Sequence, residues 1–198
     1  ITITDDSTAE GNETINLTIS AASVAIADAT GIYTVQDDDG ASDYKAQAFV
    51  KAANNAAYMG FGESIDIEGD TMVVGAKTEA SNQTTITNSA TASADVSLSN
   101  YGAGAVYVYT RSGITWTQQS YIKPPVIQDG WYFGQSVAIS GDTIAVGATG
   151  DKVYQSTITN GSTISSVTAA ENGGVYIFKR TGSNWAMEAY LKNPLAEL

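Results

Sequence analysis

The chain contains an internal repeat, and this repeat restricts the possible folds more than any other feature. The block FGESIDIEGDTMVVGA at 61–76 matches FGQSVAISGDTIAVGA at 133–148, a shift of 72 residues. A second block, GAVYVYTRSGITWTQQSYIK at 104–123, matches GGVYIFKRTGSNWAMEAYLK at 173–192, with a shift of 69 residues. The two units therefore differ by a short deletion, and we expect each to cover its apolar surface with a neighbour.

Each unit has the pattern of four β-strands. In the first unit an alternating segment and a more apolar segment flank the turn Glu68-Gly69-Asp70-Thr71, which predicts an antiparallel hairpin. The predicted strands are 64–67, 72–76, 105–110 and 115–123 in the first unit, and 137–140, 143–148, 175–179 and 184–192 in the second. A four-stranded antiparallel sheet that recurs in this way is typical of a β-propeller blade. The predicted fold class is therefore all-β, with two such blades.

A polar insert separates the second and third predicted strands of each unit. The inserts cover 77–103 and 149–172, and QTTITNSAT from Gln83 aligns with QSTITNGST from Gln155. The β-branched residues followed by Asn predict a polar hairpin in each insert. Loops of this kind either carry recognition or shield the edge of a sheet.

The charge and residue content exclude several functions. Nine basic residues against 21 acidic ones give a net charge of −12, which disfavours nucleic acid as a partner. The chain has no Cys and no His, and no Ser has a base beside it in the sequence pattern, so we do not expect an enzyme. No apolar run is long enough to cross a bilayer, and the opening ITITDD is not a signal peptide. We therefore expect a segment of a longer protein that does not insert into membranes.

A short third copy of the fourth-strand ending lies ahead of the first unit. The segment Gln47 to Lys51 matches Tyr121-Ile122-Lys123 and the corresponding end of the second unit. A closed propeller needs about four to eight blades, so two blades leave apolar faces uncovered. The extra segment either completes a last blade and closes the ring, or pairs with a neighbouring molecule.

The repeated blocks resemble a known family. The Phe-Gly before the first strand, the Gly-Asp-Thr turn, the Val-Gly-Ala ending and the Gly-Val-Tyr-Ile-Phe type of strand are similar to the FG-GAP repeat in its bacterial form, over roughly residues 44–193. The resemblance implies integrin-α-like propeller blades of an extracellular protein. Many such blades carry a calcium loop with several Asp residues, whereas these turns offer only Asp70 and Asp142, which we interpret as turn formers.

The first 39 residues have a different, acidic pattern that resembles the second half of a Calx-beta domain. ITITDDSTAEGNETINLTIS predicts a strand, an acidic turn and another strand, and TGIYTVQDDD predicts a last strand that ends in three Asp. The Calx-beta resemblance implies a partial β-sandwich with a Ca²⁺ site. The ligands carried over by the resemblance are Asp5, Asp6, Glu10, Glu13, Asp37, Asp38 and Asp39. The alternative interpretation is that these acids occupy solvated turns.

Aromatic residues recur at equivalent positions of the two units. Trp116 matches Trp185, and Phe61 matches Phe133, so we expect these side chains to pack between blades. Trp131 and Tyr132 form either an exposed platform or, as we expect, a buried contact between blades.

Taken with the resemblances, the predicted domains are residues 1–40 as the sandwich part, 41–123 as a linker, the extra strand and the first blade, and 124–198 as the second blade. The expected function is a non-catalytic, calcium-stabilised adhesion or structural module of a secreted or cell-surface protein. Its expected partners are a protein or glycan at a cell surface, or copies of itself. The alternatives are an extracellular fibre subunit completed by strand exchange and an accessory binding region of a secreted enzyme.

Overall fold

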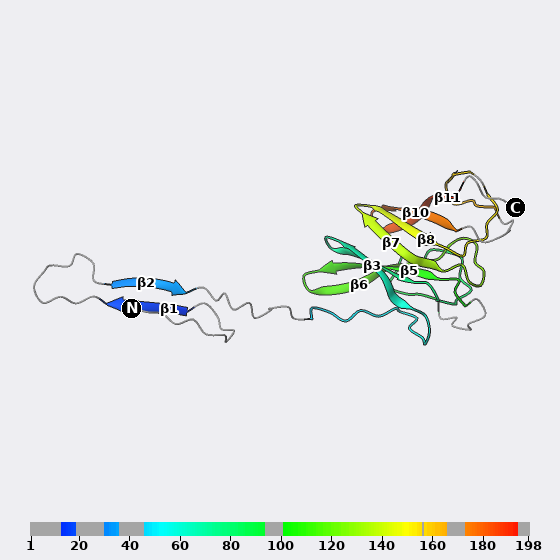
Figure 1. The fold of residues 1–198 in the computed structure, drawn as a ribbon. Coiled ribbons are helices and arrows are strands. Elements are labelled where there is room, and N and C mark those ends of the chain that lie inside the picture. Colours follow the sequence, from blue (N-terminus) through cyan, green and yellow to red (C-terminus); the bar gives the residue numbers. More distant parts are fainter. Residues whose placement is uncertain are drawn as a thin grey trace, which may run out of the picture. The chain divides into compact units, whose positions relative to one another are not determined.

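The computed structural model describes residues 13–18, 30–35, 46–93, 101–155, 157–165 and 173–193. The chain divides into two units, Ile1–Gln47 and Ala48–Leu198, which are described separately (Figure 1). Every regular element in the described residues is a β-strand, which confirms the predicted all-β class. Within these residues no helix has the length and apolar character needed to span a membrane.

The N-terminal unit contains one described pair of strands. Strand β1 (Glu13–Thr18) pairs antiparallel with β2 (Thr30–Val35), and Glu13 lies opposite Val35. The two strands coincide with the last two strands predicted for this region. The strand predicted at residues 1–4 lies outside the described residues.

The first repeat forms a four-stranded antiparallel sheet, blade 1. Its strands are β3 (Phe61–Glu68), β4 (Thr71–Ala76), β5 (Ala105–Ser112) and β6 (Thr115–Ile122), in the order β3-β4-β5-β6. Glu68 pairs with Thr71, so Gly69 and Asp70 form the two-residue turn that the sequence predicts. Gly69 has a φ of +56°, which an L side chain rarely adopts.

The second repeat forms blade 2 with the same order of strands. Its strands are β7 (Phe133–Ser140), β8 (Thr143–Ala148), β10 (Gly174–Thr181) and β11 (Asn184–Leu191), and the short β9 (Thr159–Asn160) is added beyond β11. The first strand of each blade starts three or more residues before its predicted start, at Phe61 or Phe133. An irregularity in pairing follows each of these residues, which breaks the simple alternation used for the prediction.

The described parts of the polar inserts pair with their own blades and form no separate hairpin there. In blade 2, β9 pairs with Ala189 and Tyr190 of β11. In blade 1, Thr87 and Tyr121 exchange two backbone hydrogen bonds of 2.8 and 2.9 Å. The outer strand of a sheet presents unpaired backbone groups, and the Thr-rich inserts satisfy some of them.

The two blades pack face to face through the first strand of blade 2. Strand β7 lies against β3, β4 and β5 (Figure 1). The shared core contains Val73, Val106 and Val108 from blade 1 together with many apolar side chains of blade 2. Ser64 Oγ donates a hydrogen bond of 2.8 Å to the carbonyl oxygen of Gly134, which fixes the start of β7 on blade 1.

The extra segment ahead of blade 1 is extended but belongs to no sheet. Residues 46–50 have no assigned secondary structure, and Val50 and Ala52 pack against the aromatic face of blade 1. Tyr109 OH donates a hydrogen bond of 2.9 Å to the carbonyl oxygen of Lys51. Val50 aligns with Ile122 at the end of β6, and Ile122 packs against the core of blade 2. The extra segment therefore holds a comparable place on blade 1.

Candidate functional site

Each blade buries one acid–lysine ion pair at the same position of the repeat. In blade 1, Lys123 Nζ lies 2.6 Å from Glu79 Oε2, and both side chains are fully buried. In blade 2, Lys192 Nζ lies 3.2 Å from Asp151 Oδ1, again with both side chains buried. The acid follows the second strand of the sheet and the lysine follows the fourth, so the ion pair joins two ends that are distant in sequence.

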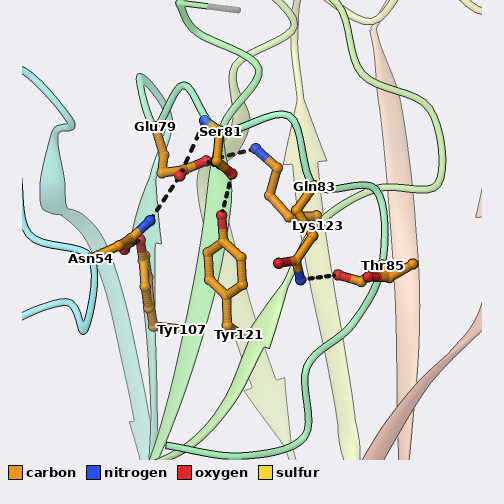
Figure 2. A network of polar contacts seen from close by, with 8 residues as sticks. All are labelled: Asn54, Glu79, Ser81, Gln83, Thr85, Tyr107, Tyr121 and Lys123. Atoms are coloured by element: carbon orange, nitrogen blue, oxygen red, sulfur yellow. Dashed lines mark hydrogen bonds and ion pairs between the residues drawn. The ribbon is translucent and has the colours of Figure 1, made fainter. Parts of the chain in front are cut away.

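The acid of blade 1 contacts the sheet's tyrosines through two small polar residues (Figure 2). Ser81 Oγ donates to Glu79 Oε2 at 3.2 Å and lies 2.7 Å from Tyr121 OH. Asn54 Nδ2 donates to Glu79 Oε1 at 3.0 Å, and Tyr107 OH donates to Asn54 Oδ1 at 2.6 Å. Asn54 lies three residues after the extra segment, so this network ties the chain between that segment and β3 to blade 1.

The acid of blade 2 contacts the equivalent tyrosines directly. Tyr176 OH and Tyr190 OH donate to Asp151 Oδ2 at 2.8 and 2.9 Å. The backbone N–H of Val153 donates to Asp151 Oδ1 at 2.7 Å, and Lys192 Nζ also donates to the Asp151 carbonyl oxygen at 3.0 Å. Both carboxylate oxygens therefore have partners, as buried charge requires.

The electrostatics of these networks suit a structural role. Burial raises the pKa of the Tyr107, Tyr121 and Tyr190 hydroxyls far above the ordinary value, and the adjacent carboxylates raise it further. Burial lowers the pKa of Lys192, and its contact with Asp151 opposes that shift. The tyrosines thus remain neutral hydrogen-bond donors at every physiological pH, which is unsuitable for general-base chemistry.

The tight turns at Asp70 and Asp142 carry a second repeated contact. Arg111 Nε lies 2.8 Å from Asp70 Oδ1, and Arg180 Nε lies 2.7 Å from Asp142 Oδ1. The predicted turn formers are confirmed, and the ion pair to the third strand was not predicted. The signal was present, because the two arginines align at the shift of 69 that relates their strands.

The guanidinium of each of these arginines also lies over the equivalent Trp ring of its blade. The distance to the ring centroid is 5.3 Å for Trp116 and 5.2 Å for Trp185, within cation–π range.

The equivalent aromatic residues differ in burial because only one blade has a neighbour on that side. Trp185 and Phe133 of blade 2 are 1% and 0% exposed, whereas Phe61 and Trp116 of blade 1 are half-buried. Trp185 Nε1 donates to Gln119 Oε1 of blade 1 at 2.8 Å. The prediction of packing between blades is thus confirmed for blade 2.

An open cavity adjoins Trp116, on the side of blade 1 where the described residues form no second blade. It measures about 570 Å³ and is lined by the extra segment and the start of β6, with Phe49, Tyr109 and Trp116 among its walls. On the other side of blade 1, Trp131 is fully buried in the core shared by the blades, as expected, and does not form a platform.

Most of the predicted Ca²⁺ ligands lie outside the described residues. This applies to Asp5, Asp6, Glu10, Asp37, Asp38 and Asp39. Glu13 is the first residue of β1, and only its backbone is described. Across the described part of the chain, no three acidic side chains come together to form a metal site.

Two successive antiparallel sheets of four and five strands, each with an equivalent internal ion pair and packed face to face, are compatible with neighbouring blades of a β-propeller. Comparison with protein families agrees, because residues 116–178 match the FG-GAP repeat. The matched stretch runs from Trp116 in β6, across the junction, to Phe178 in β10. No curated protein and no solved structure matches the chain significantly.

Proposed function

We propose that this chain is a non-catalytic adhesion or structural module, of the bacterial FG-GAP type, from an extracellular protein. The observation that carries the proposal is the match of residues 116–178 to the FG-GAP repeat, in a chain whose two sheets pack as successive blades. Its partner in this proposal is a protein or glycan at a cell surface. The net charge of −12 disfavours nucleic acid in that role.

We propose a non-catalytic role because the buried charged side chains of the two blades bond to each other. The two fully buried ion pairs of the described residues, Glu79 with Lys123 and Asp151 with Lys192, have their charged groups bonded to each other. A catalytic group must reach a substrate, and these groups hold the sheet together instead.

The exposed part of the inserts supports a role in recognition. Ile158 and Tyr154 in the insert of blade 2 are 61% and 39% exposed, although large apolar side chains are usually buried.

We expect the chain to bind cell-surface glycans or proteins, measured on a glycan array and on immobilised cell-surface extract. The double variant Tyr154→Ser and Ile158→Ser should lose this binding, while Ile114→Ser should keep it, because Ile114 is 72% exposed but lies on the β5–β6 hairpin. Equal binding by both variants would contradict the role of the inserts.

Calcium stabilisation of the N-terminal unit is the second part of the proposal. Asp5, Asp6, Glu10, Glu13, Asp37, Asp38 and Asp39 offer the carboxylate oxygens that Ca²⁺ prefers. In a chain that includes the whole sandwich, millimolar calcium should raise the melting temperature of this unit, and Asp38→Ala should remove the increase. Asp70→Ala removes a carboxylate from a blade turn and should leave the increase unchanged. No increase with calcium would reject the metal site and leave the blade assignment intact.

A further inference from the structure

The interface between the two blades has two different sides. One side is the front face of blade 2, where Phe133, Val137 and Ile139 of β7 point toward blade 1. The other side is the rear face of blade 1, which includes Ser64 and Val106. Because both blades come from one repeat, blade 1 also has a front face and blade 2 also has a rear face.

Among the described residues of the Ala48–Leu198 unit, none covers the front face of blade 1 at its first strand. Ile65 and Ile67 of β3 are 57% and 53% exposed. Their equivalents in blade 2 at the shift of 72 are Val137, which packs against the core, and Ile139, which is 9% exposed. Ile65 and Ile67 are therefore exposed on β3, whereas the equivalent side chains on β7 are packed between the two blades.

A glycine at the start of the same strand supports this assignment. Gly134 has a φ of +85°, and a Cβ added to it would meet the Ala105 carbonyl oxygen at 2.5 Å. Its equivalent Gly62 has a φ of +92°, but a Cβ there would meet nothing within 4 Å. Gly62 thus has the docking conformation of Gly134 without the surface on which it docks.

The rear face of blade 2 is the complementary uncovered surface. Val175 is 40% exposed, whereas its equivalent Val106 is 0% exposed. Ser136 and Gly147 are the equivalents of Ser64 and Gly75, the residues that receive the Gly134 carbonyl on blade 1. An open cavity of about 480 Å³ lies over Ser136, Gly147, Val175 and Leu191.

We propose that the Phe61–Ile67 edge of one copy of this chain docks on the Ser136–Val175 face of a second copy, head to tail. The internal interface shows that equivalent surfaces fit together, and the part of the blades that the structure describes leaves one surface of each kind uncovered. The proposal rests on the blade arrangement of the proposed function, but not on its calcium site or its surface partner. A contact between two different patches leads to rings or filaments.

We expect the contact between copies to be weaker than the internal interface for two reasons. The first is that blade 2 lacks two carboxylates that accept hydrogen bonds at the internal interface. On blade 1, Asp66 Oδ2 accepts a 2.7 Å hydrogen bond from the N–H of Ile139, and Glu68 accepts one from the N–H of Gly141. Their equivalents on blade 2 are Ala138 and Ser140, which lack carboxylates.

The second reason is that residues 48–53 lie on the outer half of the front face of blade 1, beside Tyr109 and Trp116. The contact between copies therefore uses the inner strands. We expect a dissociation constant of roughly 10 to 100 µM, as for a small interface.

Sedimentation velocity over a series of concentrations tests this directly. The intact chain should form species larger than a monomer, and Ile67→Asp on the front or Val175→Arg on the rear should each abolish them. Mixing these two variants leaves one good front and one good rear face, so a dimer and nothing larger should form. Both substituted residues are exposed, and the circular dichroism and melting temperature of each variant establish that it folds.

A gain-of-affinity variant distinguishes this docking from nonspecific association. Ala138→Asp restores the carboxylate that blade 1 uses to hold the N–H of β7, and it should tighten association by roughly tenfold. The matched control Ala138→Leu adds apolar area without an acceptor and should not tighten it comparably. A chain that remains monomeric at all concentrations, or a mixture of the two single-face variants that does not dimerise, would overturn the proposal.

Discussion

Lys123 Nζ lies 2.6 Å from Glu79 Oε2 with both side chains excluded from solvent, and Lys192 repeats this contact with Asp151 in the other blade. Removing two charges from water is costly, and only close contact with further hydrogen bonds offsets that cost. Ser81, Asn54, Val153 and the tyrosines provide those bonds. The ion pair therefore joins the loop after the second strand to the end of the fourth strand in each sheet.

Breaking this ion pair from one side should destabilise the blade strongly. Lys123→Met leaves Glu79 buried without its counter-charge, and we expect the free energy of unfolding to fall by about 3–5 kcal/mol. Urea unfolding followed by tryptophan fluorescence measures it, because all three Trp residues lie in the Ala48–Leu198 unit.

The control for this variant is the exposed ion pair at the turn. Arg111→Met removes a partner of Asp70, whose side chain is 70% exposed, and we expect a loss of less than about 1 kcal/mol. The double variant Glu79→Gln with Lys123→Met should recover part of the loss of the single one. Equal losses for Lys123→Met and Arg111→Met would contradict this account of the buried ion pair.

The buried tyrosines should make the fold unstable in alkali. Burial raises the pKa of Tyr107, Tyr121, Tyr176 and Tyr190 in the folded chain, while a tyrosine in the unfolded chain ionises near its usual value of about 10. The unfolded chain therefore releases protons that the folded chain retains, so stability is complete below about pH 10 and falls as the pH rises above it. Lys192, whose pKa is lowered by burial, acts in the opposite direction but is a single group.

The melting temperature measured from about pH 8 to about pH 11 checks this prediction. Tyr121→Phe removes one of these buried hydroxyls and should make the fall above about pH 10 less steep, although it also removes a hydrogen bond to Ser81. Ionisation of all the tyrosines near their usual pKa in the still folded chain, seen by ultraviolet absorbance, would argue against buried neutral hydroxyls.

Gly62 and Gly134, the equivalent second residues of β3 and β7, separate the effect of backbone strain from that of packing. Gly134→Ala and Gly62→Ala both place an L side chain at a positive φ, which costs about 1 kcal/mol in each case. Only at Gly134 does the added Cβ also meet the Ala105 carbonyl oxygen, at 2.5 Å. We expect Gly134→Ala to reduce the unfolding free energy by clearly more than Gly62→Ala in urea denaturation. The same loss for both would show that β7 does not lie on blade 1 as described.

The sequence predicted the strands well because two independent local signals agreed there. Alternating residues and the Gly-Asp turns marked both hairpins, and a repeat offers every signal twice. The pairing of the inserts was missed because β9 contains only two residues, Thr159 and Asn160, which is too short for any period. The pairing irregularity after Phe61 and Phe133 was missed because it breaks the alternation that defines a strand in a sequence.

The buried ion pairs were missed although their residues are present in both repeats. Glu79 and Asp151 align at the shift of 72, and Lys123 and Lys192 align at the shift of 69. A charged residue in a polar insert normally predicts a solvated loop, and only the folded sheet brings it to the lysine more than 40 residues later. Paired acids and bases at equivalent positions of a repeat are the signal that would have found them.

The two repeated sheets pack front to rear, with β7 on β3, β4 and β5. A Cβ built on Gly134 would lie 3.1 Å from Val106 Cγ2, so the α-protons of Gly134 must lie close to that methyl group. A nuclear Overhauser experiment on the chain with labelled valine methyl groups measures this proximity across the interface. We predict a strong cross-peak between Gly134 and Val106; a folded chain without that cross-peak would contradict the packing of the two blades.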